Sequence, residues 1–514
     1  MREVLRDRYA IAVFALALIS FVYWSVFAIH AYNTFHEYFD LATFSYNLFL
    51  YSHYPQIASG LQMLVYGNHI SPDMLFVLVL YSLLPSPLML LIVQAMALSL
   101  AGIALYFIAK DLLKSRMLGL AFALAFLLSP GVHGMLVFDF HVESFISLFY
   151  LLTFYYMMKG DKRLFYPCLA LLLGTIEVAP VMALTLGIGV GAFELLHDKD
   201  MKQRRNRIGL AASSIAISLV VLGLYALLTM HLANAYATAY PNLPSMLQLS
   251  HGTQNTLLSS ISDASRAISV FATNLSKAYS NVPTIYTIYG LAIIAFGFGI
   301  GLFFAPLAAA IMLVPWISGA VFSSQSIEFV LTWYQYFGFA MAPAAAAAIM
   351  GSMVAIERKN AQYKLLASTG FQPKSIIAAV VICFAVVLFS ASPFFIQSRN
   401  IYNLSQAFLF TGNSSINAYD AQLAWVIRQV PQNASVMTQP FIASHLANRR
   451  YVELLISNET FAPEYILVDF NMQISLNAYA NNQLSVASKV INGNPPYYLY
   501  MQNGSAELYK LGAN

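Results

Sequence analysis

The sequence predicts a polytopic α-helical membrane protein with about eleven transmembrane helices and a small extracytoplasmic α/β domain at its C-terminus. Of its 514 residues, 59% are hydrophobic and only 9% are charged. Soluble globular chains carry roughly 25% charged residues, so much of this chain must face lipid rather than water. Two further observations support this class: the placement of lysine and arginine, and a change to polar composition after residue 395. The formal net charge of +4 is small, and no nucleic-acid partner is expected.

The candidate spans are apolar stretches that approach the roughly 20 residues needed to cross a bilayer. They lie at 9–31, 87–109, 117–133, 142–158, 164–176, 178–196, 208–231, 284–304, 305–323, 335–356 and 375–395. Several are short, and the pair at 164–176 and 178–196 is compatible with packing against other helices without lipid on every side. The first stretch is longer than a signal-peptide core and lacks a small-residue cleavage site, so we expect it to be retained.

The loops between these stretches predict the orientation. Most of the 26 Lys and Arg residues form five clusters: Arg2, Arg6 and Arg8; Lys110, Lys114 and Arg116; Lys159, Lys162 and Arg163; Lys199, Lys202, Arg204, Arg205 and Arg207; Arg358, Lys359, Lys364 and Lys374. Eleven spans put every cluster on one side, so the positive-inside rule predicts a cell-membrane protein with a cytoplasmic N-terminus and an extracytoplasmic C-terminus. The transmembrane domain then covers 1–395, with long outer loops at 33–86 and 233–283.

One apolar segment, at 72–85, is too short to cross the bilayer. Counting it as a span would move Lys110, Lys114 and Arg116 to the outside. We therefore interpret it as a juxtamembrane or re-entrant helix on the outer side, within a first outer loop that contains no Lys or Arg.

Residues 396–514 read as a soluble extracytoplasmic α/β domain. Short apolar runs at 435–438 and 465–469 predict buried strands, and 418–430 predicts a helix that Pro431 stops. Asn-x-Ser/Thr sequons, which are candidate glycosylation sites on an exported surface, occur at Asn274, Asn403, Asn413, Asn433, Asn458 and Asn503. Because the tail is rich in Asn and Ser, chance accounts for some of them.

Acidic residues and histidines of the first half gather at the predicted outer ends of the helices: Asp40, His69, Asp139, His141, Glu143 and Glu177. An ionisable group at a membrane boundary is a functional candidate by default, because its burial is costly unless it is paired. A carboxylate there can act as a general base toward a hydroxyl, and carboxylates with imidazole can hold a divalent metal. If 139–143 is extended, its three such side chains share a face; if it is helical, only Asp139 and Glu143 do.

Each candidate also has a structural alternative. Asp40 suits the capping of a helix that begins beside it, and His69 suits hydrogen bonding at the helix start after Pro72. The carboxylates at 139–143 and 177 are equally compatible with solvated loops. Tyr334 and Tyr336 lie in a Trp-Tyr-Gln-Tyr cluster that is typical of an interfacial aromatic belt and is alternatively a substrate contact.

These motifs, in this order, resemble the membrane-protein family called domain of unknown function 2079, which is common in archaea and some bacteria. The resemblance covers almost the whole chain. It rests on Phe39-Asp40-Leu41, Asn68-His69-Ile70-Ser71-Pro72, Pro85-Ser86-Pro87, Asp139-Phe140-His141-Val142-Glu143 and the tail motifs at 430–439, 445–449 and 465–469. Two positions depart from the family pattern: Ile176-Glu177-Val178 stands where the family shows Lys-Glu-Asp, and Ser45-Tyr46 where it tends to carry Asp-Gln.

That family is in turn similar to GT-C membrane glycosyltransferases, which transfer sugars from polyprenyl-phosphate donors outside the membrane. The resemblance implies a GT-C-like fold and places catalytic carboxylates at Asp40 and Asp139. It also implies a divalent metal, Mg²⁺ or Mn²⁺, at a site formed by Asp40, Asp139, His141 and Glu143. The expected substrate contacts are His69, Glu177, Tyr334 and Tyr336.

The leading hypothesis is therefore a glycosyltransferase that uses a lipid-phosphate-linked sugar from the membrane. The alternative is a non-catalytic scaffold, or an envelope-assembly or binding subunit, with the same fold, which the lost polar groups around Glu177 favour. A transporter ranks third, because ionisable residues are nearly absent from the middles of the predicted spans.

Overall fold

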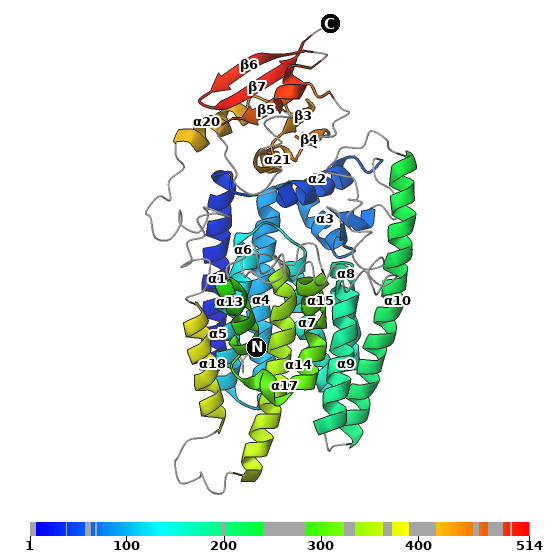
Figure 1. The fold of residues 1–514 in the computed structure, drawn as a ribbon, viewed down its shortest axis with the longest axis vertical. Helices are drawn as coiled ribbons and strands as arrows, with labels where there is room; N and C mark the ends of the chain where they lie inside the picture. Colours follow the sequence, from blue (N-terminus) through cyan, green and yellow to red (C-terminus); the bar gives the residue numbers. More distant parts are fainter. Residues whose placement is uncertain are drawn as a thin grey trace. The chain divides into compact units, whose positions relative to one another are not determined.

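The fold is given by a computed structural model, in which the chain is mostly helical (Figure 1). It describes residues 7–37, 39–56, 63–66, 69–197, 201–239, 284–322, 335–362, 373–389, 418–455, 462–470, 487–493 and 496–512. The chain divides into two compact units. The first comprises Met1–Trp24, Val93–Leu227 and Gly252–Ile396, and the second comprises Ser25–Ile92, Leu228–His251 and Gln397–Asn514.

The first unit is built of helices that follow the predicted apolar stretches. They are α5 (Arg116–Leu127), α6 (Pro130–Val137), α7 (Glu143–Lys159), α8 (Lys162–Thr175), α9 (Ala179–His197), α10 (Met201–Ala239), α13 (Thr284–Phe296), η5 (Gly301–Phe304), α14 (Pro306–Met312), α15 (Val314–Phe322), η6 (Gln335–Phe337), α17 (Gly338–Gln362) and α18 (Pro373–Phe389). Most residues of α1 (Arg8–Asn33) and α4 (Pro87–Leu113) also belong to it, and α10 belongs to it as far as Leu227. Every predicted stretch contains at least one of these helices.

Five described helices are long and apolar enough to cross a membrane: Arg8–Asn33, Pro87–Leu113, Ala179–His197, Lys202–Thr229 and Gly338–Glu357. The pair α5 and α6, bent by 41°, makes a sixth if it forms one span. The other predicted stretches are helical but are shorter or broken. By length and composition the described residues thus contain five or six spans, and the count of eleven stays a prediction.

Prolines account for several of the breaks. Pro130 and Pro306 are the first residues of α6 and α14, and Pro315 is the second residue of α15. Proline has no N–H to donate and its ring clashes with the preceding turn, so it is favoured in the first turn of a helix and disfavoured further inside it, although α8 and α17 contain Pro167 and Pro343. Pro130 and Pro315 thus divide the predicted stretches 117–133 and 305–323, whereas Pro306 lies at the predicted boundary between 284–304 and 305–323.

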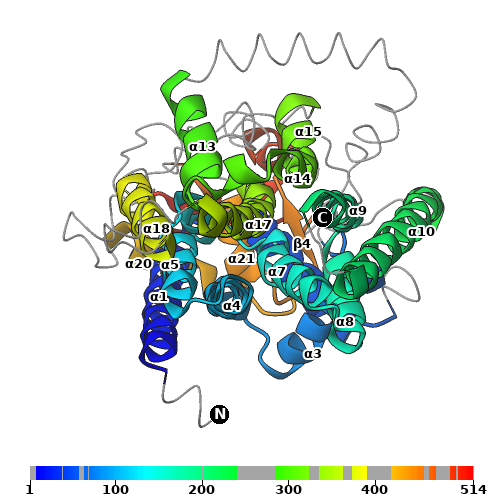
Figure 2. The same ribbon diagram turned by 90° about the horizontal axis from the view of Figure 1, so that it is seen from below.

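α17 forms the centre of the first unit, with α7 and α14 beside it (Figure 2). Its alanines at 344–348 are fully buried. A Cβ on Gly351 would lie 1.8 Å from the backbone oxygen of Gly301, so α17 and η5 approach backbone to backbone. Small residues permit this contact, as they do in other helix pairs within membranes.

The sides of the long helices that face away from the protein are apolar. On α10, Leu219, Val220, Leu224 and Leu227 are each more than half exposed. α1 presents Leu18 and Ile19 in the same way. Continuous apolar exposure of this kind on helices of span length is expected of surfaces that contact lipid.

The second unit contains a five-stranded mixed sheet. Its strands are β3 (Val436–Thr438), β4 (Val452–Leu454), β5 (Tyr465–Asp469), β6 (Tyr497–Asn503) and β7 (Ala506–Leu511), in the order β4-β3-β5-β7-β6. β4, β3 and β5 are parallel, whereas β5, β7 and β6 are antiparallel. Two helices, α20 (Ala418–Ile427) and α21 (Pro440–Leu446), accompany the sheet. The predicted strands at 435–438 and 465–469 are β3 and β5, and the predicted helix is α20.

The first outer loop contributes the rest of the second unit. It forms α2 (Phe39–His53), a short hairpin of β1 (Val65–Tyr66) and β2 (His69–Ile70), and α3 (Met74–Leu83). α3 is the short helix predicted at 72–85, and α2 packs against α21 of the tail. Residues 397–514 thus share one compact unit with 25–92.

Candidate functional site

The connection between α6 and α7 buries the acidic motif of the first unit. Asp139, His141 and Glu143 are 1%, 4% and 1% exposed, so they do not lie in a solvated loop. Residues 138–142 are not helical, and Glu143 is the first residue of α7. The motif therefore adopts neither of the two regular geometries, extended strand or continuous helix, that the spacing allowed.

Gln94 of α4 holds this connection. Its Nε2 donates to the carbonyl oxygens of Met135 at 2.8 Å and Asp139 at 3.0 Å. Its Oε1 accepts from the backbone N–H of His141 at 2.8 Å. Gln94 was missed by the sequence reasoning, although one amide inside the apolar stretch 87–109 was a usable signal, because such a group must find partners there.

Asp139 and His141 are occupied by their own segment. Asp139 Oδ1 accepts from the N–H of Phe140 at 2.8 Å, and His141 Nδ1 lies 3.3 Å from the carbonyl oxygen of Asp139. Ser144 Oγ donates to the carbonyl oxygen of His141 at 2.8 Å. Within the described residues, no three His, Cys, Asp or Glu side chains form a group able to hold a metal ion. The Mg²⁺ or Mn²⁺ site expected from Asp40, Asp139, His141 and Glu143 stays a prediction.

Glu177 and Tyr336 also belong to the first unit. Glu177 is half-buried in the turn between α8 and α9. Tyr336 is half-buried on η6, and η6 packs against α6, α7 and α17. The structure therefore brings the element that carries Tyr336 to the helix that begins at Glu143. Tyr334 lies outside the described residues.

Asp40 and His69 belong to the second unit. Asp40 is half-buried in the first turn of α2, and Glu37, just ahead of that helix, is 4% exposed. A carboxylate in a first turn is stabilised by the helix dipole, so a structural use for Asp40 remains open. His69 is half-buried on β2, opposite Tyr66 of β1.

The tail contacts the end of α1 through His445. Its Nε2 lies 3.0 Å from the carbonyl oxygen of Tyr32, and its ring packs on Tyr32 and Phe35 with centroids 4.0 and 4.5 Å apart. Burial lowers the pKa of His445 to about 4, so the ring is neutral at pH 7 and Nε2 is the protonated nitrogen that donates. Phe35 has a φ of 57°, an unfavourable value for a bulky side chain.

Two tyrosines of the first outer loop continue this contact. Tyr46 on α2 donates to the carbonyl oxygen of Arg450 at 2.8 Å. Tyr81 on α3 donates to Asn448 Oδ1 at 2.6 Å, and Asn448 Nδ2 donates to the carbonyl oxygen of Pro85 at 2.7 Å. The side chain of Asn448, in the tail motif at 445–449, thus binds the loop directly, and Tyr46 binds the backbone just after that motif.

The comparison with protein families decides the identity of the chain. The family described as predicted membrane protein DUF2079 matches residues 31–494. The chain belongs to this family. No curated protein matches it.

One of the two departures expected from the family pattern, at Ser45-Tyr46, has a structural context. Where the family tends to carry Asp-Gln, Ser45 donates to the carbonyl oxygen of Leu41 at 2.6 Å, within α2. Tyr46 is fully buried and reaches Arg450. Burial raises the pKa of Tyr46 well above its usual range, so its hydroxyl remains a donor at neutral pH. The polar pair is replaced here by a helix contact and a contact to the tail.

The sequons of this DUF2079 member are placed only in part. Asn433 is exposed in a turn before β3, and Asn503 is half-buried at the end of β6. Asn274, Asn403, Asn413 and Asn458 lie outside the described residues. The exposed side chain of Asn433 is the more accessible of the two described candidates.

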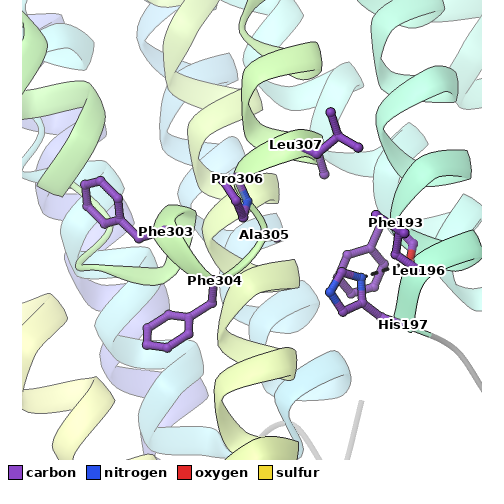
Figure 3. Close-up of a pocket in the computed structure, with 9 residues that line it drawn as sticks. Phe193, Leu196, His197, Phe303, Phe304, Ala305, Pro306 and Leu307 are labelled. Carbon is purple, nitrogen blue, oxygen red and sulfur yellow. Dashed lines mark hydrogen bonds between the residues drawn. The ribbon is translucent and has the colours of Figure 1, made fainter.

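A cavity of about 300 Å³ lies between the end of α9 and the turn from η5 to α14 (Figure 3). Its lining is mostly apolar, with Phe193, Leu196 and Phe304 among its residues, and His197 supplies the imidazole. His197 Nδ1 lies 3.2 Å from the carbonyl oxygen of Phe193. The cavity is at the end of α9 that the basic clusters predict to be cytoplasmic, and it contains none of the predicted site residues.

Proposed function

We propose that this DUF2079 member is a GT-C-like glycosyltransferase that uses a lipid-phosphate-linked sugar donor on the extracytoplasmic side of the membrane. The observation that supports the proposal best is the second unit, in which Asp40 lies on a loop that is hydrogen-bonded to the tail through Tyr46 and Tyr81. In such a transfer the sugar donor lies in the lipid and the acceptor lies outside the membrane. The catalytic carboxylate is therefore expected near the bilayer surface, on a segment that is bound to the soluble domain.

Asp40 is assigned the role of general base. The acceptor hydroxyl oxygen attacks the anomeric carbon of the donor, and the bond from that carbon to the phosphate oxygen breaks. The lipid phosphate leaves with the bonding electron pair, and Asp40 takes the hydroxyl proton. His69 would orient the acceptor. No step depends on a metal ion.

The test is donor turnover by the purified protein in lipid nanodiscs. The probes are polyprenyl-phosphate glucose and polyprenyl-phosphate mannose, each radiolabelled in the sugar, with a lysate of the native envelope as the acceptor mixture. Because a general base contributes typically 10²–10⁴-fold, Asp40→Asn should lower sugar transfer by about 100-fold or more. Asp73→Asn, a matched change in the same outer loop, should retain transfer. Equal rates for wild type and Asp40→Asn would contradict the proposal.

The second candidate is a non-catalytic scaffold, in which the tail and the first outer loop together form a docking site for other proteins. The observation that favours it is Tyr46, which stands at a departure from the family pattern and bonds the tail. A scaffold predicts that Asp40→Asn complements a deletion strain fully, whereas Tyr46→Phe does so poorly.

A further inference from the structure

Helix α7 carries three polar side chains along one face. Glu143, Ser147 and Tyr150 follow one another at spacings of four and three residues, so they lie on one side of the helix. All three are at most 1% exposed. They lie inside the first unit, where α8, α9, α17 and η6 pack against α7.

The polar atoms of this face have no hydrogen-bond partner in the described part of the chain. This holds for both carboxylate oxygens of Glu143, for Ser147 Oγ and for Tyr150 Oη. Buried polar groups are normally paired, because burying one without a partner is unfavourable. Other hydroxyls of α7 follow that rule: Ser144 donates to His141 and Thr153 to Phe149. Among the described polar side chains of α7, those without a hydrogen-bond partner are therefore confined to one face.

The spacing of these polar atoms without hydrogen-bond partners indicates which kind of ligand they can bind. From Glu143 to Tyr150 the helix rises by about 10 Å, so the three side chains are spread too far to converge on a single cation. A carboxylate disfavours an anion such as a phosphate. A ligand with several hydroxyl groups can donate to Glu143 and exchange hydrogen bonds with Ser147 and Tyr150. The phenol ring also offers an apolar surface, which is usual in small-molecule sites.

We propose that the face of α7 formed by Glu143, Ser147 and Tyr150 binds a neutral polyhydroxyl ligand of the sugar class. All four orphaned atoms are covered by protein, so binding requires part of the cover from the neighbouring helices to shift. The site concerns binding alone and does not rest on the transferase activity proposed above.

The experiment uses the full chain in nanodiscs or in a sugar-free polyoxyethylene detergent. The probes are methyl α-D-glucoside, methyl α-D-mannoside and maltose, with sodium chloride and inorganic phosphate as ionic alternatives. Affinity is measured by isothermal titration calorimetry, and folding by thermal unfolding without ligand. Glu143→Gln should weaken sugar binding at least tenfold, and Ser147→Ala and Tyr150→Phe about fivefold each. Ser144→Ala is the matched control, because Ser144 already has its partner.

The ligand-free measurement separates binding from misfolding. Since Tyr150 Oη and Ser147 Oγ have no partner, removing either hydroxyl should leave the unfolding temperature unchanged or raised. Asp73→Asn, a change in the first outer loop outside both proposed sites, should bind the same sugar like wild type. The proposal is overturned if none of the three sugars binds, if only the ions bind, or if Ser144→Ala weakens binding as much as Ser147→Ala.

Discussion

At the scale of single residues, Gln94 shows how a polar group inside an apolar helix can organise a neighbouring segment. It satisfies two carbonyl oxygens and one N–H of the connection between α6 and α7, all of them buried. The sequence identified Asp139, His141 and Glu143 by their charge but not the glutamine that holds them. The partners are more than forty positions apart, and no local pattern links them.

Replacing Gln94 should destabilise the protein. Gln94→Leu leaves the carbonyl oxygens of Met135 and Asp139 and the N–H of His141 without this partner, and each unsatisfied buried group costs roughly 1–3 kcal/mol. We expect a loss of about 3 kcal/mol in unfolding free energy, measured by thermal or chemical unfolding in detergent. Met96→Ala, an exposed position on the same helix, should change stability little. Equal stability of Gln94→Leu and wild type would show that the connection does not depend on this amide.

His445 predicts a pH dependence of stability. Its pKa falls from 6.5 to about 4 on burial, so below pH 6.5 the unfolded chain binds a proton that the folded chain does not. Stability should therefore fall as pH drops from about 6.5 toward 4, by at most about 3 kcal/mol. Thermal unfolding of the full chain over this range measures it. His445→Gln should flatten the dependence, while the exposed His53→Gln should not; an unchanged curve for His445→Gln contradicts the assignment.

At the scale of elements, the sequence located most helices because apolar runs and helices of the first unit coincide. It placed a boundary beside Pro306, where α14 begins, but it did not locate the breaks at Pro130 and Pro315, since hydropathy averages over them. It identified α3 as a non-spanning helix from its short length and from the side on which the next basic cluster would otherwise fall. α2 was expected only as part of a partly helical loop.

α3 should lie in the membrane interface. Phe76, Val79 and Leu83 are 66%, 62% and 73% exposed, while Met74, Val77 and Tyr81 on the other side are buried. A short helix with one apolar exposed side and one packed side is suited to lie along the bilayer surface. A spin label at Phe76→Cys, in a chain lacking Cys168 and Cys383, should be accessible to oxygen and shielded from a water-soluble nickel complex. A label at the exposed Gln432→Cys should behave oppositely. Strong nickel accessibility at position 76 would exclude the interfacial placement.

At the scale of the whole molecule, composition predicted the class of protein, and the family match agrees with it. That the first outer loop and the tail form one compact unit could not be predicted from the sequence. It depends on contacts such as Tyr81 with Asn448 and Tyr32 with His445, which are separated by hundreds of residues. No three His, Cys, Asp or Glu side chains among the described residues form a metal-binding group, and the metal site expected from the resemblance stays a prediction.

The predicted orientation has a direct test. In a chain without its native cysteines, Asn433→Cys should react with a membrane-impermeant maleimide in intact cells. Lys202→Cys, an exposed position at the start of α10, should react only after lysis, because the positive-inside rule places its cluster in the cytoplasm. The reverse pattern would place the tail inside the cell and remove the basis for an outer-surface activity.

The measurement that tests the central proposal most directly is the glycan profile of the native host's envelope, taken by mass spectrometry of its glycoproteins and glycolipids. Four strains are compared: wild type, a deletion, and the deletion complemented with Asp40→Asn or with Asp73→Asn. A transferase with Asp40 as its base predicts that one sugar addition is lost in the deletion, restored by Asp73→Asn and not restored by Asp40→Asn. A profile unchanged by the deletion, or fully restored by Asp40→Asn at equal protein level, would contradict it.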